Sequence, residues 1–291
     1  MKDYILVLLA DVLLAATLLF QKKYQKSAGV SINAGLAYNV VTGVFSAAIF
    51  LGINKFSPAA SLFSLLMAAL FASLLVIYIL IGFRIMKKGS MSLYTLFLMT
   101  GGMTLPYIWG LFFLNEELTL IRTIGLVVIV LAIALSNTGA EKPDKKQMLM
   151  CIVVFILNGG VSVVAKMHQV SPLNNGVSSL DFVFWVNIFK AILCFVVLLC
   201  VKDKGKNDEC ENFGIKQLLP VLFAAAAADG ISFMLQLNGA VNLPATVLYP
   251  IITGGSIVMT SLAGVLVYKE KLSKRQWASV IICLAGTCLF L

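Results

Sequence analysis

The stretch "LMTGGMTLPYIWGLFFLNEEL", residues 98–118, decides the fold because a second stretch repeats its plan. That second stretch is "IITGGSIVMTSLAGVLVYKEKL", residues 251–272. The triplet Thr100–Gly102 recurs as Thr253–Gly255, 153 positions later, and each copy is an apolar run that ends in an acidic turn. Neither triplet is followed by Lys-Ser or Lys-Thr, so neither is a phosphate loop. The pattern indicates an internal duplication.

The composition is typical of a protein that crosses a membrane several times. Of 291 residues, 60% are hydrophobic and 12% are charged, whereas a soluble domain is about 45–50% apolar and about 25% charged. The net charge is +9, but the basic residues lie in short gaps between apolar runs, which argues against nucleic-acid binding. One histidine, and six cysteines without a CxxC pair, leave little for a metal or cofactor site. We expect none.

Ten apolar runs have the length of a bilayer-crossing helix, about 20 residues. No soluble domain fits between them, and the longest polar gap is residues 202–216. The first run lacks the cleavage pattern of a signal peptide, so we expect it to stay as the first span. The predicted spans are 3–21, 32–53, 59–83, 91–114, 119–137, 147–166, 178–201, 216–236, 244–268 and 274–291.

The basic residues predict the orientation. With the adjoining run ends included, the gaps after the odd-numbered runs hold 17 Lys or Arg, whereas the N-terminus and the gaps after the even-numbered runs hold 4. Lys190 lies within the seventh run and completes the 22. Because Lys and Arg stay cytoplasmic, the count places both termini outside.

Three collinear matches extend the duplication. Residues 14–25 align with 158–169 at an offset of 144, and Lys22 then meets Lys166. Residues from 37 align with those from 185 at an offset of 148, and Asn39 meets Asn187. The third match is the opening pair, in which Glu117 meets Glu270. We predict two five-helix units, residues 1–140 and 141–291. An odd number of spans per unit inverts the second copy, as in many secondary transporters.

These features resemble the EamA-type branch of the drug/metabolite transporter superfamily. The match is carried by a lysine ending the first helix of each half (Lys22 or Lys23, and Lys166), a polar residue early in the second helix, and a fourth helix that runs through Pro into a Glu-x-Leu turn. The resemblance implies an all-α integral membrane protein with ten transmembrane helices in two inverted repeats. Where the family usually has arginine in the second helix, this chain has Asn39 and Asn187.

The first helix also resembles that of the small multidrug-resistance branch of the superfamily. There a glutamate in an Ala-Glu-Val context binds protons and cationic drugs. Ala10-Asp11-Val12 matches that context with the shorter acid. The resemblance implies that Asp11 binds protons or an amine.

Charged and polar residues within the runs are candidate substrate ligands because each needs a partner or a wet cavity. One alternative is that they pair with each other, Asp229 with Lys190 for instance. The amides can instead bond across helices, and the aromatic residues can simply pack. Glu116, Glu117 and Glu270 fit helix capping better, and the doubled glycines mark close packing or flexing. The candidate substrate-binding residues are Asp11, Lys22, Asn39, Lys166, Asn187, Lys190, Asp229 and Tyr249.

The sequence therefore predicts a secondary active transporter of the cytoplasmic membrane rather than an enzyme. We expect efflux or exchange, by alternating access, of a small polar metabolite or drug. The mix of lysines and aspartates suggests a zwitterion such as an amino acid, with coupled protons as a further option. We expect a monomer or homodimer with lipid as its surroundings. The alternatives are a membrane enzyme, for which acidic metal-binding clusters are missing, and a channel, for which a filter-like loop is missing.

Overall fold

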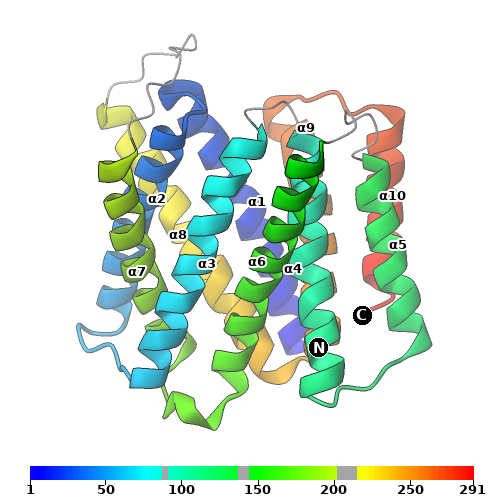
Figure 1. Cartoon of the computed structure of the whole chain (residues 1–291), viewed down its shortest axis with the longest axis horizontal. Helices are drawn as coiled ribbons and strands as arrows, with labels where there is room; N and C mark the ends of the chain where they lie inside the picture. The colour runs from blue at the N-terminus through cyan, green and yellow to red at the C-terminus, as the bar shows by residue number, and fades with distance from the viewer. Residues whose placement is uncertain (87–90, 137–143, 202–214) are drawn as a thin grey trace.

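The structure is a computed structural model that describes residues 1–86, 91–136, 144–201 and 215–291 (Figure 1). Within these ranges the chain forms α-helices and one short 3₁₀ turn, with no strand. The predicted boundary at 140/141 and most of the polar gap 202–216 lie outside the described residues. The elements are α1 (Lys2–Ala28), α2 (Ile32–Ile53), α3 (Leu62–Met86), α4 (Met91–Phe113), α5 (Leu120–Ser136), α6 (Lys145–Val170), η1 (Pro172–Asn174), α7 (Ser179–Cys200), α8 (Ile215–Asn242), α9 (Ala245–Tyr268) and α10 (Lys274–Cys288).

Eight of the described helices, α1–α4 and α6–α9, are long and apolar enough to cross a membrane. The apolar helix α5 has 17 residues and α10 has 15. At 1.5 Å per residue they are about 26 Å and 22 Å long, shorter than a bilayer core of about 30 Å. The two short helices end the two predicted units.

The helices stand side by side, and both chain ends lie toward the same end of the bundle (Figure 1). The most extensive contacts join α1 to α8, α4 to α6, α2 to α7, α3 to α6, and α5 to α10. Each of these contacts joins a helix before residue 137 to one after residue 143. The two parts of the chain are therefore interleaved, and the largest apolar clusters contain residues of both.

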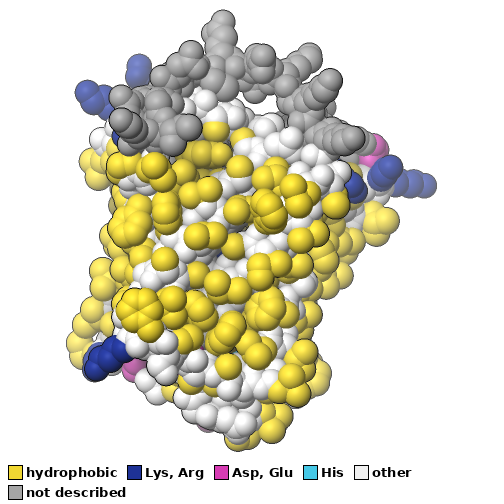
Figure 2. Space-filling model, turned by 90° about the vertical axis from the view of Figure 1, so that its left-hand side faces the viewer, with side chains coloured by type: hydrophobic (Ala, Val, Ile, Leu, Met, Phe, Trp, Pro, Cys, Tyr) yellow, Lys and Arg dark blue, Asp and Glu magenta, His cyan; other side chains and the backbone are white. Residues whose placement is uncertain are grey.

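Apolar side chains cover the face of the bundle seen in Figure 2, and Lys and Arg lie near its upper and lower margins. Large exposed hydrophobic residues occur along many helices, among them Leu66, Phe112, Leu266 and Ile281. Such a surface is unfavourable in water and suits lipid, because each helix satisfies its own backbone hydrogen bonds. The chain is a multi-pass membrane protein.

Polar residues at the helix starts fix where several helices begin. The Ser31 side chain accepts a hydrogen bond from the backbone N–H of Ala34 at the start of α2. Reciprocal capping boxes start α6 at Asp144, α7 at Ser178 and α10 at Ser273. Each side chain replaces an intrahelical partner that the first turn lacks.

The first glycine of each doubled pair allows a close helix contact. A Cβ on Gly101 would overlap the backbone of Phe155 in α6, and one on Gly254 would overlap the Thr287 side chain in α10. Small residues let membrane helices approach closely. The structure thus favours close packing over flexing for these two positions.

Candidate functional site

A cavity of about 320 Å³ lies between helices of both parts of the chain. It is lined by residues of α1, α3, α4, α6, α7, α8 and α9. Four of the eight predicted site residues line it: Asn187, Lys190, Asp229 and Tyr249. The lining is mainly apolar with a few charged and amide side chains, and such polar groups inside an apolar bundle are where a membrane protein can hold a polar solute.

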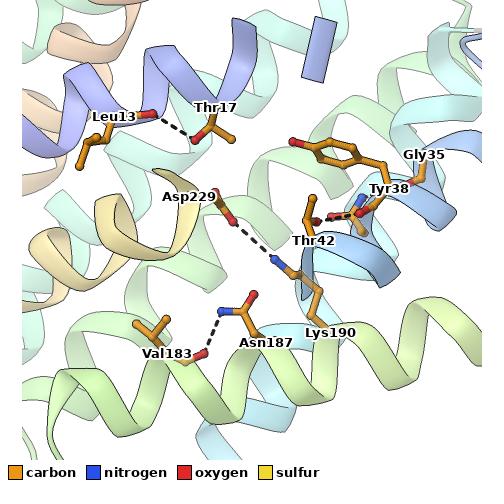
Figure 3. A network of polar contacts seen from close by, with 10 residues as sticks. Leu13, Thr17, Gly35, Tyr38, Thr42, Val183, Asn187, Lys190 and Asp229 are labelled. Carbon is orange, nitrogen blue, oxygen red and sulfur yellow. Dashed lines mark hydrogen bonds and ion pairs between the residues drawn. The ribbon is translucent and has the colours of Figure 1, made fainter. Parts of the chain in front are cut away.

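The charged centre of the cavity is an ion pair between α7 and α8. Lys190 Nζ lies 3.5 Å from Asp229 Oδ2, and Figure 3 shows the two side chains pointing toward each other. The Lys190 side chain is 8% exposed and the Asp229 side chain 38%. Lys190 and Asp229 therefore pair with each other and also line the cavity, so both alternatives from the sequence apply. As an ion pair, the two side chains add no net charge to the cavity.

Asn187 lies one turn before Lys190 on α7, as Figure 3 shows. Its Nδ2 donates to the Val183 carbonyl at 2.9 Å, within its own helix. Its Oδ1 is buried and has no hydrogen-bond partner among the described residues. A buried amide oxygen without a donor is costly, so this atom is a ready acceptor for a ligand beside Lys190.

Hydrogen bonds between helices hold the polar wall of the cavity. Tyr249 on α9 donates to the Ser162 carbonyl of α6, and Asn158 donates to the Leu98 carbonyl at 2.7 Å. On α8, Ser232 Oγ donates to the Ala10 carbonyl of α1 at 2.7 Å, and it accepts from Gln236 Nε2 of its own helix at 3.1 Å. The side chains that donate these bonds line the cavity, and the bonds hold its walls in place.

An aromatic wall completes the cavity. Phe71 and Phe233 lie with ring centroids 5.0 Å apart, and Tyr78 lines the same space. These residues are not predictable from the sequence, because nothing distinguishes an inward phenylalanine in an apolar run from a lipid-facing one. Asn158 and Gln236 carried a signal, as amides within predicted spans, but were not chosen.

The other four predicted residues are not among the residues that line this cavity. Lys166 is buried and donates to the carbonyls of Ala240 and Leu243, at 2.6 and 2.7 Å. It therefore binds the C-terminal end of α8. Lys22 forms an ion pair with Glu270, and both side chains are partly exposed.

Asp11 and Asn39 also lie elsewhere. Asn39 Nδ2 donates to the Gly35 carbonyl of its own helix at 2.8 Å. Asp11 is fully buried, and its two carboxyl oxygens have no hydrogen-bond partner in the described part of the chain. Its carboxyl group packs on Gly255, where a Cβ would overlap Oδ2. The second glycine of the α9 pair is thus the surface against which Asp11 lies.

Comparison with known proteins assigns the family. The model of the EamA-like transporter family matches residues 142–291. The chain belongs to the EamA-like transporter family. The resemblance to the EamA-type branch is confirmed, and the protein is a membrane transporter of the drug/metabolite transporter type, whose family members are transporters rather than enzymes.

A solved structure supports the fold of this EamA-like protein. That crystal structure has a TM-score of 0.75 over 99% of this chain and 96% of its own, at 13% sequence identity. At such identity the likeness shows the fold alone. No match was found among curated protein sequences. Within the described residues, no three His, Cys, Asp or Glu side chains come together as metal ligands.

The acidic turns of the EamA-like chain differ in one respect from the sequence alignment. Asn115 and Lys269 both have positive φ, 51° and 54°, and the next residue in each case is the equivalent glutamate. Glu116 N donates to the Gly110 carbonyl at 3.1 Å, and Glu270 N to the Gly264 carbonyl at 3.3 Å. The structure therefore matches Glu116, not Glu117, with Glu270. Gly102 and Gly255 are 153 positions apart, but Gly110 and Gly264 are 154 apart. An alignment with a constant offset of 153 therefore pairs the wrong glutamate with Glu270.

Proposed function

We propose that this EamA-like protein is a secondary active transporter that moves a small zwitterion, such as an amino acid, by alternating access. The observation that supports this most is the Lys190–Asp229 pair in a central cavity, beside the open acceptor Asn187 Oδ1. A substrate with one carboxylate and one ammonium complements such a cavity without adding net charge. We propose efflux or exchange across the cytoplasmic membrane, by a monomer or homodimer.

The substrate site that we propose consists of Asn187, Lys190, Asp229 and Tyr249. Lys190 faces a carboxylate, Asp229 and Asn187 Oδ1 face an ammonium group, and Tyr249 lines the same cavity on α9. Phe71 and Phe233 supply apolar surface for a side chain. We propose no contact between substrate and Lys22, Asn39 or Lys166 in this conformation, because their polar atoms bond elsewhere.

We propose that residues 1–140 and 141–291 are inverted five-helix repeats, with α5 and α10 as the fifth helix of each. The paired turns at Glu116 and Glu270 support this, as does a family match that starts at residue 142. We also propose that both termini lie outside, as the count of basic residues indicates. A reporter fused after Leu291 tests the orientation: activity confined to the cytoplasm would reverse it.

Asp11 is our proposed site of proton coupling. It is fully buried and its carboxyl oxygens are unpartnered among the described residues. An unpaired charge is expensive at this depth, so gain and loss of a proton would be tied to a conformation in which water reaches it. Asp11→Asn should abolish accumulation driven by a pH gradient and leave substrate exchange. Unchanged accumulation would remove Asp11 from this role.

Liposomes containing the purified protein test transport itself. A mixture of radiolabelled neutral amino acids is loaded inside, and release is measured without ATP. We expect release that saturates with concentration and is lost in Lys190→Gln. The matched control is Leu66→Ala, an exposed position on α3, which should behave as wild type. Absence of release across a broad panel of zwitterions would contradict the proposed function.

A further inference from the structure

We propose that Asp229 is a built-in counterion of Lys190, which the carboxylate of the substrate replaces during transport. The inference rests on the proposed alternating-access function and adds to it what the protein does with its own charge when empty. It also assigns Asp229 a role other than simple substrate binding. In this scheme the chain carries an internal substitute for the substrate's anion.

The geometry of the pair supports replacement rather than a fixed structural bridge. The 3.5 Å between Lys190 Nζ and Asp229 Oδ2 exceeds the 2.7–2.9 Å typical of a charge-assisted hydrogen bond. Lys190 donates no hydrogen bond to any other described residue, although an ammonium group has three donors. Lys190 therefore has a charge partner while its hydrogen-bonding capacity stays open to an incoming carboxylate.

The unequal exposure of the two partners points the same way. The Lys190 side chain is 8% exposed, whereas that of Asp229 is 38% exposed. Asp229 can turn toward the cavity and still be solvated; Lys190 cannot leave the protein interior without moving α7. The lysine is thus the fixed charge and the aspartate the movable one.

A second buried group beside the pair marks where the rest of the ligand goes. Asn187 is 2% exposed, and its Oδ1 lacks a donor in the described part of the chain. It lies one turn from Lys190 on the same helix, so the two side chains share a face. When the substrate carboxylate forms an ion pair with Lys190, the ammonium group of the same molecule can donate hydrogen bonds to Asn187 Oδ1 and to the released Asp229.

In the substrate-free protein, Asp229 would neutralise Lys190 and so allow the cavity to close. Alternating access requires the cavity to close without substrate before the protein can turn back. Removing one partner of a buried ion pair leaves the other charge uncompensated, so Lys190 without Asp229 should keep the empty cavity hydrated. With substrate bound, the carboxylate restores the balance and closure proceeds. Asp229→Asn weakens binding of the substrate ammonium, but at saturating substrate it should impair the return of the empty protein far more than exchange.

Thiol labelling tests this without any transported solute. Ser256, which lines the cavity on α9, is changed to cysteine in a full-length chain whose six native cysteines are replaced. Its reaction with a charged methanethiosulfonate reagent is timed in the empty protein. We expect Asp229→Asn to react about tenfold faster than the parent, because an unpaired lysine is disfavoured in a dry interior.

Two further variants separate charge imbalance from damage to the fold. Lys190→Gln/Asp229→Asn has no charge to balance and should return to the parent rate, and Asp229→Glu, which keeps the charge, should stay near it. Equal rates in Asp229→Asn and the parent would overturn the proposal. So would a double variant that remains as fast as Asp229→Asn, because opening would then be independent of Lys190.

The role of the carboxylate is tested with matched ligands. A mixture of neutral amino acids should slow the labelling of Asp229→Asn, and the corresponding amines, which lack only the carboxylate, should not. Equal effects of the two mixtures, or none from either, would overturn the replacement. In liposomes at saturating substrate, Asp229→Asn should lose at least about tenfold more of its net release than of its exchange, each relative to wild type. If wild type releases nothing, the proposed function fails, while labelling of the empty protein still decides the counterion role.

Discussion

Lys166 and Glu116 bind the two ends of the turn that joins α8 to α9: Lys166 binds the end of α8 and Glu116 the start of α9. The Lys166 ammonium contacts the carbonyls of Ala240 and Leu243 at the end of α8. The Glu116 carboxylate accepts the N–H groups of Ala245 and Thr246, at 2.7 and 2.8 Å, at the start of α9. A cation thus meets the negative end of one helix and an anion the positive end of the next. The turn is held by residues from α6 and from the segment after α4.

Lys166→Met should destabilise the protein by about 2 kcal/mol or more, because buried carbonyls at the end of α8 lose their donor. Lys22→Met is the matched control. Lys22 is the lysine that aligns with Lys166 in the proposed repeat, and its pair with Glu270 is partly exposed, so its removal should cost about 0–1 kcal/mol. Thermal unfolding in detergent, read by intrinsic fluorescence, compares the two. Equal losses would contradict the structural role of Lys166.

Glu116→Ala should cost about 0.5–2 kcal/mol, the range for loss of a helix N-cap. Its neighbour Glu117 is exposed, and Glu117→Ala should change stability by less than about 0.5 kcal/mol. The comparison also checks which glutamate is equivalent to Glu270. Thermal unfolding in detergent measures both variants. A larger loss of stability in Glu117→Ala would favour the pairing of Glu117 with Glu270 that the sequence spacing indicates.

The sequence predicted the class of protein, the positions of the apolar helices and the family, because the membrane imposes length and composition directly. It also identified Lys190 and Asp229, since a charge inside an apolar run must be accommodated. It could not tell which lysine faces the cavity. Lys166 and Lys190 both look costly to bury, and the choice depends on how α6 is rotated against the end of α8. Spacing alone carries no such information.

The aromatic wall was beyond prediction for a related reason. Phe71 lines the cavity, while Phe112 is exposed on the outside of the bundle. Both lie in continuous apolar runs, and in a lipid environment the outward face is as apolar as the inward one. The periodic pattern that separates the two faces of a helix in a soluble protein is therefore absent. Polar residues were the usable signal, and they located only part of the site.

Gly255→Ala should destabilise the protein by about 1–3 kcal/mol, the range for overpacking a core. The added methyl group would overlap the carboxyl group of Asp11. In Asp11→Ala that carboxyl group is gone, so the glycine substitution should then cost much less. Gly52→Ala is the control, because a Cβ there meets nothing within 4 Å. A double-mutant cycle measures the coupling, and strictly additive effects would show that the two residues do not press on each other.

Asn187→Leu should weaken transport, whereas Asn39→Leu, the equivalent change in the first half, should have little effect. The two asparagines occupy matching positions in the sequence, but only Asn187 is among the residues lining the cavity, with Oδ1 open to a ligand. A hydrogen bond to a charged group is worth about 1.5–3 kcal/mol, so the half-saturating concentration of a transported zwitterion should rise about tenfold or more. Both variants should unfold near the wild-type temperature, because each asparagine bonds only to its own helix. Concentration-dependent uptake into liposomes gives the comparison. Equal losses in the two variants would contradict the asymmetry of the site.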